Sequence, residues 1–98
     1  MPGRFIVRPL AEADLEQAAR CYNDERPGLG ARFLADVHQV FTRIRETPQQ
    51  FPVVDRKIRR ALLHAFPYAV YFQERDESLV VLAVLHLRRR PGLWRVRS

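Results

Sequence analysis

The residues best suited to chemistry lie in the second half of the chain, where arginines and aromatics stand beside apolar runs. Arg59 and Arg60 are adjacent in one run, and Tyr71 lies in the next. His86 ends the longest apolar run and is followed, after Leu87, by the basic cluster 88–90. A guanidinium group donates a planar fork of hydrogen bonds, which suits a phosphate or a carboxylate better than a lysine ammonium does. The pattern predicts a rigid cationic surface that binds an anionic partner.

Two of these side chains could move protons. An imidazole titrates near neutral pH, so His86 is a candidate general base, although a histidine that closes an apolar strand often caps the sheet end structurally. Tyr71 alternates with the more polar positions Ala69 and Gln73, which makes it the tyrosine with functional potential. The alternative for Tyr71 is a half-buried ring with its hydroxyl at the surface. Tyr68 alternates with apolar residues and is expected in the core.

The arginines also have more than one interpretation. Arg59 and Arg60 must point to opposite faces of a strand, so only one can enter a given cleft. Either could instead protect a sheet edge from aggregation. Trp94 could stack on a nucleic-acid base or, alternatively, fold back to close the core. A second basic group, Arg88 to Arg90, follows the end of the longest apolar run. It could clamp phosphate or protein carboxylates, or it could be a solvated tail.

Several site classes are not indicated. The sequence has no glycine-rich phosphate loop, no paired-carboxylate site and no serine, cysteine or carboxylate that completes a nucleophilic triad with His86. The single Cys21 excludes an intramolecular disulfide and a cysteine-based zinc cluster. The three histidines lack metal-ligand spacing; they are His38, His64 and His86. We therefore expect no metal and no cofactor.

Length and charge point to one small basic domain. A chain of 98 residues, 47% of them hydrophobic, is expected to fold as a single domain over residues 1–98. The net charge is +6, and residues 56–98 carry ten of the 17 basic residues but only three of the 11 acidic ones. With no membrane span and no signal-peptide core, the expected location is the cytoplasm.

Hydrophobic periodicity predicts two helices and four strands. A strand at 4–8 precedes helices at 10–25 and 29–47, and a loop at 48–55 precedes strands at 58–64, 68–75 and 79–87. The last of these strands is apolar at consecutive positions and should be buried on both faces. The expected class is α+β with two layers, in the order strand-helix-helix-strand-strand-strand. A helical hairpin would cover one face of a small antiparallel sheet, which leaves the other face for partners.

These features together resemble the RelE/ParE toxin superfamily, most closely its ParE-like branch. The resemblance covers nearly the whole chain and depends on the order of many short motifs. They are Ala13-Asp14-Leu15, Tyr22, Gly28-Leu29-Gly30, Phe33, Pro48, Phe51-Pro52, Arg59-Arg60, Phe66-Pro67-Tyr68, Val70-Tyr71, Val81-Leu82-Ala83-Val84, His86, Arg88-Arg89, Pro91 and Trp94.

The resemblance implies a cytoplasmic toxin of a type II toxin–antitoxin module, neutralised in a hetero-oligomer by a small antitoxin encoded beside it. ParE-like members inhibit DNA gyrase, whereas RelE-like members cut messenger RNA on the ribosome with basic side chains and often a C-terminal tyrosine. No tyrosine follows Tyr71, and the His-x-Arg-Arg-x-Pro ending is similar to ParE-like and plasmid-stabilisation proteins. We therefore expect a gyrase inhibitor.

Each activity implies its own site residues. For gyrase inhibition, the expected contact is the basic C-terminal region, which includes Arg88. The residues expected to bind the target are Arg60, Arg89, Arg90 and Trp94. The RelE-like alternative, a ribosome-dependent endoribonuclease, would use Arg59, Arg88, Tyr71 and His86. A third alternative is a nucleic-acid-binding domain that only shares the fold.

Overall fold

The computed structural model describes residues 3–88 and 92–97 and contains one mixed sheet with two long helices. The elements follow in the order β1 (Arg4–Val7), α1 (Pro9–Glu25), α2 (Leu29–Glu46), the 3₁₀ turn η1 (Pro48–Gln50), β2 (Val53–Asp55), β3 (Ile58–Leu62), β4 (Tyr68–Arg75), β5 (Ser78–His86) and α3 (Leu93–Val96). The predicted α+β class and order of elements are confirmed, and β2 and α3 are additional elements.

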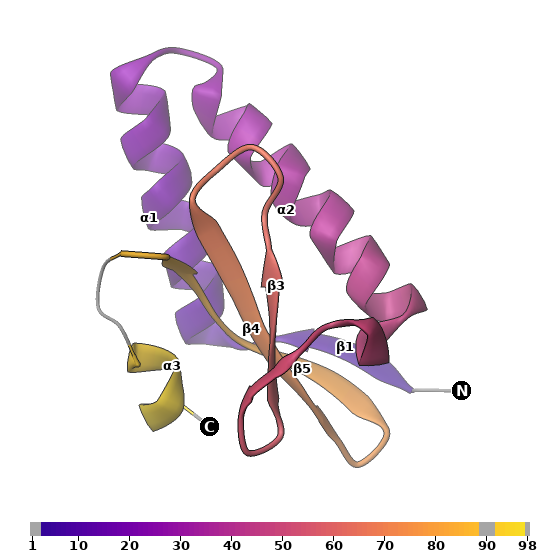
Figure 1. Ribbon diagram of the computed structural model, residues 1–98. Helices are drawn as coiled ribbons and strands as arrows, with labels where there is room; N and C mark the ends of the chain where they lie inside the picture. Colours follow the sequence, from indigo (N-terminus) through magenta and orange to yellow (C-terminus); the bar gives the residue numbers. More distant parts are fainter. Residues whose placement is uncertain (1–2, 89–91, 98) are drawn as a thin grey trace.

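The five strands are arranged in the order β1-β5-β4-β3-β2 (Figure 1). Strands β2 to β5 form an antiparallel meander, whereas β1 joins β5 in parallel. The sheet is therefore mixed, whereas the sequence had indicated an antiparallel one. The β4–β5 hairpin closes through Asp76 and Glu77, both with positive φ (48° and 64°), as expected of a two-residue turn that matches the twist of the strands.

Helices α1 and α2 form an antiparallel hairpin on one side of the sheet (Figure 1). Pro9 begins α1, where its fixed φ suits the first helical turn and its missing N–H costs nothing. Asn23 Oδ1 accepts hydrogen bonds from the N–H groups of Gly28 and Gly30 at 3.0 and 3.3 Å, which closes the tight connection. A Cβ at Gly30 would lie 2.5 Å from the carbonyl oxygen of Ala19, so the close approach of the helices requires glycine there.

Apolar side chains occupy both faces of the sheet. On the face beneath α1 and α2, which we call the helix side, the core centres on Phe33, Ile44, Val70, Phe72 and Val81. Tyr68 belongs to this cluster, as predicted. On the opposite face, which we call the open side, a smaller cluster is closed by Trp94 of α3; its buried members are Ile58, Ala69, Tyr71, Val80, Leu82, Ala83 and Trp94.

The helices do not have the character of membrane spans. Among the described residues, no helix combines the length and the apolarity needed to cross a bilayer.

Candidate functional site

Arg59 lies on the helix side and is engaged by backbone carbonyls. It stands opposite Phe72 in the register, and its Nη1 donates to the carbonyl oxygen of Phe51 at 2.6 Å and, at 3.5 Å, to that of Gln49. These bonds hold the segment between η1 and β2 against β3. Arg59 is therefore directed away from the open side and stabilises the segment between η1 and β2.

Arg60 lies on the open side, so the predicted opposite orientation of the two arginines is confirmed. It faces Tyr71 across the β3–β4 pair and is half-buried. Its Nε is buried, and so is Nε2 of Gln73, and among the described residues neither atom has an acceptor. A buried donor without an acceptor typically costs about 1–3 kcal/mol, so this part of the open side has unused hydrogen-bonding capacity.

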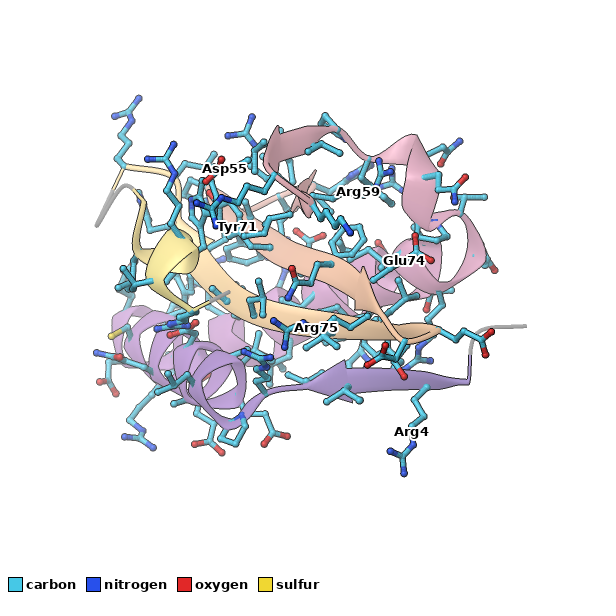
Figure 2. The ribbon with its side chains drawn as sticks, turned by 90° about the horizontal axis from the view of Figure 1, so that it is seen from below. Arg4, Asp55, Arg59, Tyr71, Glu74 and Arg75 are labelled. Carbon is cyan, nitrogen blue, oxygen red and sulfur yellow. The ribbon has the colours of Figure 1, made fainter. Side chains whose placement is uncertain are left out.

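Tyr71 is covered by the C-terminal helix. Its ring stacks on that of Trp94, with centroids 5.0 Å apart and planes 11° from parallel. Tyr71 is 6% exposed and Trp94 is 8% exposed. Figure 2 shows α3 lying across the sheet beside Tyr71. Trp94 thus folds back on the core, which was one of its two predicted roles, and a partner that needed either ring would have to move α3.

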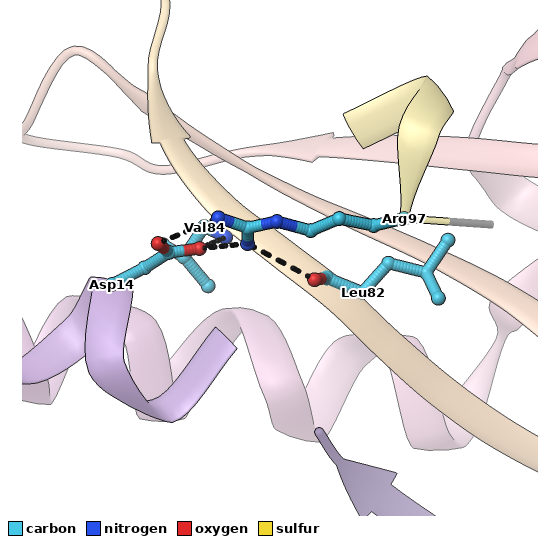
Figure 3. Close-up of polar contacts among 4 residues, drawn as sticks. All are labelled: Asp14, Leu82, Val84 and Arg97. Atoms are coloured by element: carbon cyan, nitrogen blue, oxygen red, sulfur yellow. Dashed lines mark hydrogen bonds and ion pairs between the residues drawn. The ribbon is translucent and has the colours of Figure 1, made fainter. Parts of the chain in front are cut away.

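A largely buried ion pair holds α3 in this position (Figure 3). The guanidinium of Arg97 donates to both carboxylate oxygens of Asp14 in α1, at 2.6 and 3.2 Å, and to the carbonyl oxygen of Leu82 at 3.3 Å. The same carboxylate accepts the N–H of Val84 at 3.0 Å, and Arg8 donates to the carbonyl oxygen of Arg97 at 2.9 Å. This network, which we call the Asp14–Arg97 clamp, joins α1, β5 and α3.

The end of β5 carries an exposed arginine and the second candidate base. Arg88 is exposed, and its backbone N–H donates to Nδ1 of His86 at 3.1 Å. The ring of His86 lies 5.2 Å from that of Tyr68. Both rings border a cavity of about 190 Å³ between α1 and β5, so the ring of His86 lies on the helix side of the sheet. Arg89 and Arg90 lie outside the described residues.

The four residues of the endoribonuclease alternative do not converge. Arg59 is bound to carbonyls on the helix side, and Tyr71 is buried beneath α3 on the open side. His86 lies at the far end of β5, beside Tyr68, and Arg88 follows it. Of these four residues, the structure brings together only His86 and Arg88, whereas Tyr71 lies beside Arg60 and Trp94. No group of three or more His, Cys, Asp or Glu side chains among residues 3–88 and 92–97 is arranged to hold a metal ion.

Sequence reasoning missed the residues that position α3. Asp14 was identified only as part of the motif Ala13-Asp14-Leu15, and Arg97 had no assigned role. The two are separated by 83 positions, so no local pattern could have joined them. Gln73 was identified only as a polar neighbour of Tyr71; its amide, which directly follows five hydrophobic positions of β4, was the available signal.

Comparison with known proteins gives one family and one fold. The model of the family described as the ParE toxin of type II toxin-antitoxin system, parDE, matches residues 5–91. A solved chain of the chromosomal ParDE TA system from P. aeruginosa superposes with a TM-score of 0.79 at 15% sequence identity, covering 89% of this chain and 98% of that one. At 15% sequence identity, this superposition shows that the two chains share a fold and no more than that. No curated protein matches the sequence.

Proposed function

Because this chain belongs to the ParE toxin family of type II toxin–antitoxin systems, we propose that it inhibits DNA gyrase in the cytoplasm and is neutralised by a cognate antitoxin. The family match over residues 5–91 supports a toxin. The choice of gyrase over messenger RNA depends on one observation: the candidate nuclease residues Arg59 and Tyr71 lie on opposite faces of the sheet. A phosphoryl-transfer site needs its cationic and proton-transferring groups within hydrogen-bond reach of one phosphate.

The proposed gyrase contact is the basic surface at the end of β5. Arg88 is exposed there, and Arg89 and Arg90 continue the charge along the chain. Arg60 adds a half-buried guanidinium on the open side, where its Nε has no acceptor among the described residues. Arginine forks of this kind bind carboxylates of an acidic protein surface in a bidentate manner and increase the rate of encounter. Trp94 contributes indirectly, since its burial holds α3 against the sheet.

Inhibition of gyrase predicts a change in DNA topology inside cells. Expression of this chain should arrest growth, and plasmid extracted from the arrested cells should be less negatively supercoiled than plasmid from uninduced cells. Electrophoresis in chloroquine agarose separates the topoisomers and measures the shift. Growth arrest with unchanged plasmid topology, and with codon-positioned cuts in messenger RNA by primer extension, would favour the endoribonuclease alternative instead.

A further inference from the structure

Two side chains of the open side hold buried N–H donors that have no acceptor. Gln73 follows Tyr71 by two positions on β4, and Val80, its partner in the register, belongs to the buried cluster of the open side. Gln73 therefore lies on the open side, and it is 7% exposed. Its Nε2 and the Nε of Arg60 are buried, and neither bonds to an acceptor in the part of the chain that the structure describes. Polar atoms are seldom buried in this way, so the two donors require an explanation.

The two donors are close enough to serve one ligand. Arg60 stands directly opposite Tyr71 in the β3–β4 register, and Gln73 shares the face of Tyr71 two residues further along β4. Arg60 and Gln73 are thus diagonal neighbours on adjacent strands. Such neighbours are typically about 7–8 Å apart, which is within reach of long side chains. We call this pair of residues the Arg60–Gln73 site.

The chemistry of the Arg60–Gln73 site fits a carboxylate. The site offers N–H groups from a guanidinium and an amide, and a carboxylate accepts hydrogen bonds through two oxygens and donates none. The positive charge of Arg60 strengthens such bonds and favours an anion over a neutral carbonyl. The acid of the neighbouring strand, Asp55, is instead paired with Arg95 at 3.1 Å. The site is therefore complementary to a carboxylate from another molecule.

Helix α3 extends across β3 beside this site (Figure 2). Trp94 stacks on Tyr71 of β4, whereas the next residue, Arg95, reaches Asp55 of β2. Because β3 lies between β4 and β2 in the sheet, α3 bridges the strand that carries Arg60. An incoming carboxylate therefore needs α3 to move before it can reach the buried Nε.

We propose that the Arg60–Gln73 site receives one carboxylate side chain of the target protein, and that α3 moves away from β2 to admit it. This inference rests on the proposed toxin function and adds Gln73 to it as a binding residue. The attachment of α3 to β2 is its weaker one, because the pair formed by Arg95 and Asp55 is exposed, whereas the clamp at the other end is largely buried. The bound carboxylate accepts from both buried donors, which offsets the loss of the exposed pair.

Replacing Gln73 by methionine separates binding from stability. Methionine is unbranched and of similar size but has no N–H, so the variant removes a buried donor that lacks an acceptor, and the melting temperature should rise by roughly 4–8 °C. The same variant should inhibit gyrase at least about tenfold more weakly, because a hydrogen bond to a charged group of the target is lost. The matched control is Gln39→Met, at an exposed glutamine of α2, which should leave both quantities close to wild type.

Nuclear magnetic resonance can detect the site without gyrase. Sodium acetate replaces sodium chloride at constant ionic strength in a solution of nitrogen-15-labelled protein. The Nε–H resonance of Arg60 and the Nε2 resonances of Gln73 should then shift progressively and to saturation. In Gln73→Met the shift at Arg60 should be several-fold weaker, whereas Gln39→Met should respond as wild type does. No shift at Arg60 or Gln73 on replacing chloride by acetate would overturn the proposal.

The remaining outcomes are equally decisive. A lower melting temperature of Gln73→Met with unchanged inhibition would overturn the proposal, because Gln73 would then be a packing residue. Acetate binding to the wild type with unchanged inhibition by Gln73→Met would overturn the assignment of the carboxylate to the target. If the wild type leaves gyrase active, the proposed function fails, while the acetate titration still decides whether the Arg60–Gln73 site binds a carboxylate.

Discussion

Replacing Arg97 by alanine is expected to lower the free energy of unfolding by about 3 kcal/mol, because it leaves one partner of a largely buried ion pair behind. The side chains of Arg97 and Asp14 are only 12% and 14% exposed. Without Arg97, the Asp14 carboxylate would keep the N–H of Val84 but lose two charge-assisted hydrogen bonds. Urea denaturation measures the loss, which would be a large part of the roughly 5–15 kcal/mol typical of a domain.

Arg95→Ala is the matched control for this prediction. Arg95 lies in the same short helix and pairs with Asp55 at 3.1 Å, but the two side chains are 61% and 34% exposed. An exposed pair contributes about 1 kcal/mol or less, so this variant should remain close to wild type. Trp94 is the only tryptophan, and its emission should shift to the red in Arg97→Ala if α3 leaves the sheet. Equal losses of stability in the two variants would contradict the clamp.

Reversing the charge at Arg88 and Arg89 together is expected to weaken gyrase inhibition by at least about tenfold, because like charges then face each other across the proposed contact. Arg88 is exposed at the end of β5, so its replacement should leave the fold intact. The measurement is the concentration of Arg88→Glu/Arg89→Glu protein that halves the supercoiling rate. Raising the salt concentration should weaken the wild type more than this variant, since screening reduces only attractions that are present.

The control for charge alone reverses two arginines elsewhere. Arg4 and Arg75 are exposed and both stand opposite Ser78 in the register, at the other end of β5 from Arg88. Arg4→Glu/Arg75→Glu changes the net charge by the same amount and should inhibit gyrase as wild type does. If both double variants lose activity equally, net charge and not the β5 surface governs inhibition.

Local patterns were sufficient for the long elements. The apolar residues of α2 recur at helical spacing, and the predicted 29–47 agrees with Leu29–Glu46. Strand β4 was predicted with the same bounds as observed, and β5 was displaced by one residue. Strands β4 and β5 bury most of their length and α2 buries one face, so their hydrophobic pattern is strong. The charge pattern also indicated a basic second half, which contains Arg60 on the open side and the exposed Arg88.

Short or long-range features could not be predicted in this way. Strand β2 has three residues and was included in a loop, because its pairing with β3 is a tertiary property. A β-bulge between Tyr71 and Phe72 shifts the register opposite Leu82. As a result, Leu82 and Val84 belong to clusters on opposite faces, although strict alternation would place both on the same face.

The candidate site was predictable in composition and not in arrangement. Adjacent arginines on opposite faces follow from strand geometry, and this was confirmed for Arg59 and Arg60. That Tyr71 lies beneath Trp94, however, depends on a clamp between the first helix and the last one. Such a contact leaves no trace in local spacing, and the hydrogen bonds from Arg59 to the η1–β2 backbone are likewise tertiary.

The most direct test of gyrase inhibition uses purified components. Relaxed plasmid, gyrase and ATP are incubated with increasing amounts of this chain, and supercoiled product is measured over time. We predict that supercoiling falls with toxin concentration and recovers when the antitoxin is added in equal amount. Full supercoiling at saturating toxin, with a properly folded preparation, would contradict the account.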